Sequence, residues 1–157
     1  MFQVNNYKIV VPYAPESINK VIGYGKSEGD IVVLKHKWQR LASIILEQAI
    51  VESKLPSKFK GRIGVFFILY FKTDRGRDGD NYSAMCKGII DAMVRKNMIP
   101  DDNYNYVDDD GRRLRIDPER PRAEVYIKEK IKGSDLITIK PYGEIKGSSS
   151  DFIMQEV

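Results

Sequence analysis

Three aspartates and one lysine occur in a pattern that could carry metal-dependent chemistry. Asp78 and Asp80 are separated by one glycine, Lys87 follows them, and Asp102 lies beyond Pro100. In an extended backbone, residues i and i+2 point to the same side, so the first two carboxylates would repel each other without a cation. Mg²⁺ binds through carboxylate oxygens and water. The spacing therefore predicts a divalent-metal site at Asp78 and Asp80.

A helix beginning near Asp80 would carry Lys87 and Asp91 on the same face as Asp80, because residues i, i+7 and i+11 share a face. Lys87 would then lie about two turns from the acidic pair, within reach of a phosphate oxygen, and Asp91 could orient its ammonium. A return turn after the helix could bring Asp101 or Asp102 back to the pair. These parts suit phosphodiester hydrolysis, in which a metal activates water and a cation stabilises developing charge.

Each of these residues also has a structural interpretation. Asp78 and Asp80 could cap a helix or form a turn, because short acidic side chains accept backbone N–H bonds. Lys87 and Asp91 could form an exposed i,i+4 ion pair. Asp102 could be a turn residue after the proline, and Asp101 is expected to be solvated.

Hydrophobic spacing predicts the elements that must position these residues. Residues 63–71 are apolar at nearly every position, which indicates a central strand covered on both faces. Residues 35–52 and 81–97 have helical spacing, and Pro100 prevents continuation of the second helix. The stretch Asp108-Asp109-Asp110-Gly111 has the composition of a hairpin turn. Further strands are expected at residues 7–12, 31–34, 104–107, 112–116, 123–127 and 136–139, with loops at 12–30 and 72–79.

The fold class expected from this order is α+β, a single domain with a mixed four- to five-stranded sheet and two main helices. The chain has 157 residues, of which 42% are hydrophobic and 31% charged, an ordinary balance for a globular protein. Residues 1–140 are expected to form the domain and 141–157 a flexible tail. No apolar run approaches the roughly 20 residues that span a bilayer, and Cys86 is the single cysteine. No membrane association and a cytoplasmic location are therefore expected.

The charge distribution favours a polyanionic partner. The formal net charge is +4 and the sequence pI is about 9.0. Carboxylates set among basic groups suit a metal-dependent nuclease, although a solvated surface of mixed charge is the alternative. The basic residues expected to contact DNA are Lys35, Lys37, Arg40, Arg75 and Arg77.

Three blocks of sequence together resemble the RusA family of Holliday-junction resolvases. They read R-D-G-D-N at residues 77–81, K-G-I-I-D-A at 87–92 and D-D at 101–102. The similarity is strongest over residues 77–102 and extends over 7–127. It implies a homodimer, a Mg²⁺ or Mn²⁺ requirement, and symmetric nicking of four-way (Holliday) junctions in DNA recombination and repair. A phage or prophage origin is frequent in this family.

The resemblance also implies residue roles. Asp78 and Asp80 match the metal-binding pair, Asp102 matches a third acidic ligand, and Lys87 matches the catalytic lysine. Asp91 matches an acid near the site. Two further residues of the blocks would support the site, namely Asn81 and Asp101.

The segment from Asp80 to Lys87 is three residues longer than in the best-known member of that family. Three helical residues preserve the face but move Lys87 by roughly 4.5 Å along the axis. Two alternatives to a strict resolvase therefore stay open. One is a non-catalytic dimer that binds branched DNA, and the other is a metal nuclease with a broader range of branched substrates.

Overall fold

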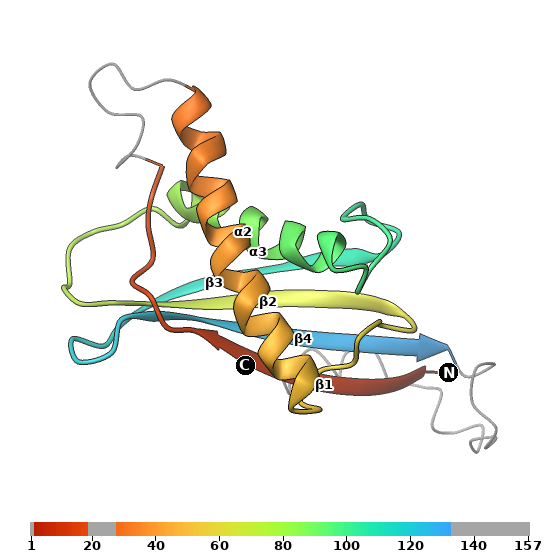
Figure 1. Cartoon of the computed structure of the whole chain (residues 1–157). Coiled ribbons are helices and arrows are strands. Elements are labelled where there is room, and N and C mark those ends of the chain that lie inside the picture. Colours follow the sequence, from red (N-terminus) through yellow and green to blue (C-terminus); the bar gives the residue numbers. More distant parts are fainter. Residues whose placement is uncertain (1, 19–27, 133–157) are drawn as a thin grey trace.

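The structure, a computed structural model, describes residues 2–18 and 28–132, and its two main helices lie on one face of a mixed sheet (Figure 1). The expected α+β class, with a four-stranded mixed sheet and two helices, is confirmed. The strand expected at 136–139 and the tail at 141–157 lie outside the described residues. The elements are β1 (Phe2–Val11), α2 (Glu28–Val51), β2 (Arg62–Phe71), η1 (Gly79–Tyr82), α3 (Ser83–Arg95), β3 (Val107–Ile116) and β4 (Arg122–Lys132).

The strand order β1-β4-β2-β3 places the segment that contains Asp78, Asp80 and Lys87 at one end of the sheet. β4 pairs antiparallel with β1 and with β2, whereas β2 and β3 are parallel neighbours. Parallel neighbours need a crossover connection, and here η1 and α3 provide it. η1 therefore follows the carboxyl end of β2, an edge where loops in crossover folds commonly form binding sites.

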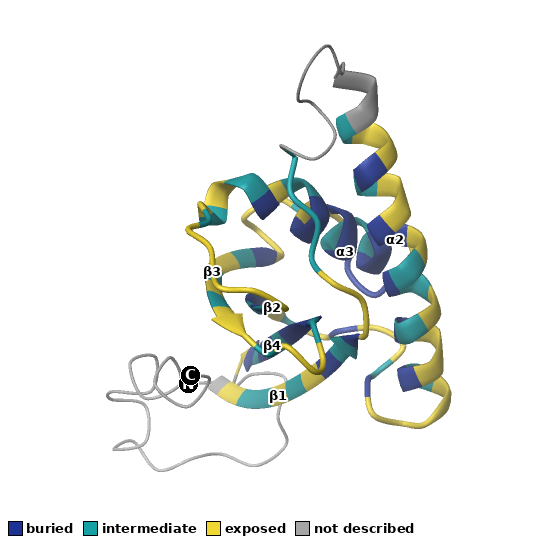
Figure 2. Ribbon diagram, turned by 90° about the vertical axis from the view of Figure 1, so that its left-hand side faces the viewer, coloured by how far each residue is buried: buried dark blue, intermediate teal, exposed yellow. Residues whose placement is uncertain are grey.

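Helix α2 begins earlier than its sequence pattern indicates, and the strand expected at 31–34 is wrong because those residues are helical. The β-branched residues in that stretch favour a strand locally. Leu34, however, lies one turn before Trp38 and two turns before Ala42, and all three are buried. The buried stripe that packs against α3 and the sheet (Figure 2) therefore outweighs local propensity.

Strand β2 is central, as expected, but helices cover only one of its faces (Figure 2). Val65 and Phe67 point into the core beneath the helices. On the opposite face Phe66 is 8% exposed, and among the described residues its cover comes from long side chains instead of a second layer of helices. Arg113 lies over the Phe66 ring, and Arg122 lies over Tyr70.

The stretch Asp108-Asp109-Asp110-Gly111 is not a hairpin turn but part of the continuous strand β3. The register with β2 shifts between Val65 and Phe67, which pair with Asp109 and Arg112, so β3 holds one extra residue. Gly111 has φ +99°, a conformation that glycine adopts at little cost and that characterises a β-bulge. The bulge places Asp109 and Arg112, three residues apart, on the same helix-facing side of the sheet.

The two helices cross at very close range, and Gly88 makes this possible. A Cβ atom at Gly88 would lie 2.3 Å from the Lys35 carbonyl oxygen and 3.2 Å from the backbone nitrogen of Gln39. Small residues at a crossing allow helix backbones to approach, and this contact sets the position of α3 against α2. Among the described residues, no helix combines the length and apolarity needed to cross a bilayer.

Candidate active site

The acidic pair lies at the start of η1, after the loop that follows β2. Asp78 has an extended backbone, and its Oδ1 accepts a hydrogen bond from the Asp80 amide at 3.0 Å. Asp78 is therefore the N-cap of η1, the structural role that the sequence left open. Capping occupies only one of its carboxylate oxygens, and both side chains belong to exposed residues.

Lys87 lies on the second turn of α3 between two carboxylates. Its ammonium is 3.2 Å from Asp91, the expected i,i+4 pair, and it also forms an ion pair with Asp102. Asp102 belongs to the loop between α3 and β3, which turns back toward the helix as expected. Lys35 from α2 reaches the other oxygen of Asp91 at 3.9 Å. These contacts hold the Lys87 ammonium in place while its side chain stays 45% exposed.

The structure brings Asp102 to Lys87, but it does not assemble the three predicted metal ligands into one cluster. Within residues 2–18 and 28–132, no three or more His, Cys, Asp or Glu side chains form a group that could hold a metal ion. Asp78 and Asp80 remain a separate pair at the N-terminal end of the helix. The predicted metal set Asp78, Asp80 and Asp102 is thus divided into an exposed pair and an ion-paired acid.

Two supporting residues have mainly structural contacts. Asp101 accepts hydrogen bonds from the Asp102 amide at 2.7 Å and from the Asn103 side chain at 3.0 Å, which shapes the return loop. The carbonyl of Asn81 accepts a hydrogen bond from the Ile18 amide at 2.8 Å. This hydrogen bond holds the segment after β1 next to the acidic pair.

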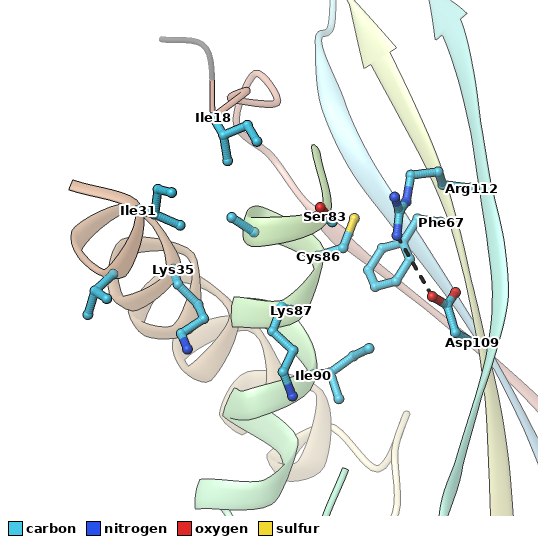
Figure 3. A pocket seen from close by; sticks show the side chains of 12 residues that line it. Ile18, Ile31, Lys35, Phe67, Ser83, Cys86, Lys87, Ile90, Asp109 and Arg112 are labelled. Atoms are coloured by element: carbon cyan, nitrogen blue, oxygen red, sulfur yellow. Dashed lines mark ion pairs between the residues drawn. The ribbon is translucent and has the colours of Figure 1, made fainter. Parts of the chain in front are cut away.

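A cavity of about 450 Å³ adjoins Lys87 between the helices and β3. Figure 3 shows Lys35 and Lys87 on the helices at one side of the pocket, and Asp109 and Arg112 on the sheet at the other side. The remaining wall is largely apolar and includes Phe67. The charged part of the lining thus consists of three cationic side chains and one carboxylate.

The thiol of Cys86 faces this cavity, where burial keeps it protonated. Burial raises the pKa of Cys86 to about 12, and the neighbouring guanidinium of Arg112 opposes that rise only in part. The thiol is therefore neutral at physiological pH and poorly nucleophilic. The residue serves as core packing, consistent with its 2% exposure.

The basic side chains predicted to contact DNA differ in whether other residues of the chain already bind them. Lys37 forms an ion pair with Glu16 at 2.6 Å. Arg77 donates to the Thr73 carbonyl at 2.6 Å and lies over the Phe71 ring, so it shapes its own loop. Lys35 pairs with Asp91, the carboxylate that also contacts Lys87. Arg40 and Arg75 are exposed and form no ion pair with any described residue.

Sequence reasoning missed Arg112 as a site residue. Its guanidinium donates to the Gly79 carbonyl at 3.1 Å, between the two acidic residues, and lies 3.8 Å from Asp109. Its inward orientation depends on the bulge at Gly111, which leaves no periodic signal in the sequence. Arg112 is a positioning residue that supports the loop carrying Asp78 and Asp80.

We expect Arg112→Gln to displace the loop that carries Asp78 and Asp80. If this loop holds a catalytic cation, metal-dependent hydrolysis should weaken about 10- to 100-fold, because small displacements of a catalytic group have effects of that size. The apparent affinity for Mg²⁺ should fall with it, which loss of general stability would not cause. Arg112→Lys, which can still donate to Gly79, should restore part of the activity. The matched control is Arg113→Gln on the opposite face of β3. Equal Mg²⁺ dependence in all the variants would show that Arg112 does not position the acidic loop.

No protein-family model matches the sequence, and no curated protein matches it. Among solved structures, one similar chain is the hydrogenase maturation protein HypE in complex with ATP, at 9% identity and a TM-score of 0.30. The match covers 85% of this chain and 31% of that one, so this chain spans about a third of its length. A TM-score this low supports no argument about fold or function, and the site must be judged on its own geometry.

Proposed function

We propose that this chain is a divalent-metal-dependent DNA endonuclease that cuts four-way junctions. The observation that carries the proposal is the Lys87 ammonium, held between Asp91 and Asp102, on the helix that follows the exposed pair Asp78 and Asp80. The resemblance of these three sequence blocks to the RusA resolvases supplies the substrate class. A homodimer, with one site for each of two symmetric strands, belongs to the same proposal.

The donor set at Asp78 and Asp80 fits Mg²⁺ or Mn²⁺. Both ions prefer carboxylate oxygens, and Mg²⁺ commonly keeps several waters while binding only one or two carboxylates. The cap accounts for one Asp78 oxygen and leaves the others accessible. When bound, the metal would polarise the phosphoryl oxygen and lower the pKa of an attacking water.

The chain's own residues have distinct roles in this proposal. Asp78 and Asp80 hold the cation, and Arg112 holds their loop through Gly79. Lys87 donates to a phosphate oxygen and stabilises the negative charge that develops during hydrolysis. Asp91 and Asp102 orient the ammonium, and Asp102 exchanges part of that contact for the incoming phosphate.

The test is cleavage of a labelled four-way junction beside a linear duplex of matched sequence, with Mg²⁺, with Mn²⁺ and with chelator. We expect paired symmetric nicks in the junction, only with metal. Equal cutting of flaps and other branched substrates would favour the broader metal nuclease. Light scattering of the same preparation would measure whether the active species is a dimer.

A non-catalytic DNA-binding dimer is the second candidate, and two observations favour it. Asp78 already has a capping role, and Asp102 is engaged by Lys87 instead of joining the acidic pair. This candidate predicts salt-sensitive junction binding without product in either metal. Absence of cleavage together with tight binding would therefore replace the nuclease proposal.

A further inference from the structure

The outward side of the α2–α3 pair carries a hollow rich in basic side chains, separate from the cavity beside Lys87. It measures about 450 Å³. Its lining comes from one face of α2 and the last turn of α3. The residues are His36, Gln39, Arg40, Ser43, Ile44 and Arg95.

The guanidinium of Arg95 is held in a defined orientation. Gln39 is 8% exposed, and with its amide oriented to satisfy both partners its oxygen accepts hydrogen bonds from Nε and Nη1 of Arg95, each at 3.2 Å. A guanidinium has five N–H groups, so three remain available to an anion. An arginine fixed in this way loses little side-chain entropy when it binds.

The acidic residues of the neighbouring turns already have lysine partners. Asp91, one turn before Arg95, pairs with Lys35 and Lys87. Glu47, one turn after Ser43, pairs with Lys96 at 2.5 Å. These two carboxylates are therefore already paired with lysines and do not neutralise the arginines of the hollow.

Arg40 and Arg95 consequently remain uncompensated. Neither forms an ion pair with any residue in the described part of the chain. Two guanidinium groups, an imidazole and the Ser43 hydroxyl around one hollow form a donor set for a tetrahedral anion. Arginine is the side chain best matched to phosphate, because its fork can bind two oxygens at once.

We propose that this hollow binds a backbone phosphate of the DNA substrate; the inference deepens the proposed function and rests on it. The hollow continues the line of the candidate active site along the same two helices. Lys35 pairs with Asp91, and four residues later on each helix, about 6 Å along the axis, Gln39 pairs with Arg95. When the phosphate to be cut lies at Lys87, another phosphate of the same DNA would lie at the Gln39–Arg95 pair. This second contact would fix the position of the DNA along the two helices.

The open face of the sheet is also basic, and its arginines already have contacts within the sheet. Arg113 lies over the Phe66 ring, and Arg115 donates to the Leu114 carbonyl at 2.9 Å. Arg122 bonds to Glu124 at 2.9 Å and to Asp117 at 2.7 Å, and Arg62 pairs with Asp108. A phosphate there would have to displace existing partners. The helical hollow needs no such exchange, which favours it as the phosphate contact.

The test compares junction binding by wild type, Arg40→Gln/Arg95→Gln and the control Arg115→Gln, whose side chain belongs to the open sheet face. Fluorescence anisotropy in chelator, over a series of salt concentrations, measures Kd without cleavage. We expect the double variant to raise Kd on the order of tenfold and to reduce the salt slope by about 1, the loss of one phosphate contact. The control should stay within about twofold of wild type.

His36 provides an independent reporter, because it is the single histidine of the chain. Its imidazole NMR resonances should shift when the junction is added, and this response should be lost in the double variant. A double variant that binds like the control, with an unchanged salt slope, would overturn the phosphate site even if wild type cuts junctions. Weakened binding by the double variant, with no cleavage by wild type in metal, would support the phosphate site and reject the nuclease.

Discussion

Asp80→Asn should abolish junction cleavage, with a loss of about 10³-fold or more in the rate at saturating Mg²⁺. The substitution removes one negative charge and little else, since the hydrogen bonds of Asp80 with described residues use its backbone amide and carbonyl. A neutral amide is a much weaker ligand for a hard cation than a carboxylate. DNA binding in chelator should be retained or slightly tightened, because the variant repels phosphate less.

The control for this prediction is Asp74→Asn, the same chemical change at an exposed position of the preceding loop. It should leave cleavage within about twofold of wild type. Full cleavage by Asp80→Asn would exclude Asp80 as a metal ligand and with it the proposed site.

Asp78 allows metal binding to be separated from capping. Asparagine is as good an N-cap as aspartate, whereas alanine costs about 1 kcal/mol. Asp78→Asn should therefore lose cleavage while its thermal unfolding stays close to wild type. Asp78→Ala should lose both cleavage and stability. Cleavage retained in Asp78→Asn and lost only with stability in Asp78→Ala would indicate that the residue is a cap alone.

Gly88→Ala should lower the free energy of unfolding by about 1–3 kcal/mol, the usual cost of overpacking. Alanine favours a helix over glycine by about 1 kcal/mol, so propensity alone predicts the opposite sign. The deciding fact is that the new Cβ would lie 2.3 Å from the Lys35 carbonyl oxygen, a backbone atom that only a shift of the whole helix can relieve.

Thermal unfolding followed by circular dichroism measures this effect, and a fall in Tm of roughly 2–12 °C is expected. The matched control is Gly76→Ala, where an added Cβ meets nothing within 4 Å. Separation of the helices should also loosen the contact of Lys35 with Asp91 and so reduce cleavage by the folded fraction. A variant as stable as wild type would show that the helices can part at little cost.

Much of the architecture could be predicted from hydrophobic spacing. The central strand, both helices and the α+β class follow from runs of apolar residues whose period reflects which side is buried. The i,i+4 contact of Lys87 with Asp91 follows in the same way, because helix geometry alone brings these residues together. Short-range geometry also explains why Asp78 and Asp80 were found as a pair.

Tertiary structure decided the rest, because it depends on packing between segments distant in the chain. Residues 31–34 have strand propensity, yet burial of Leu34 beside Trp38 makes them helical. The Asp108-to-Gly111 stretch has turn composition, yet pairing with β2 makes it a bulged strand and turns Arg112 toward Gly79. The hollow at Arg40 and Arg95 exists because Gly88 lets two helices meet. The sequence by itself determined which residues carry charge and which local element each prefers. Only the assembled fold decided which charges are paired and which remain free to bind phosphate.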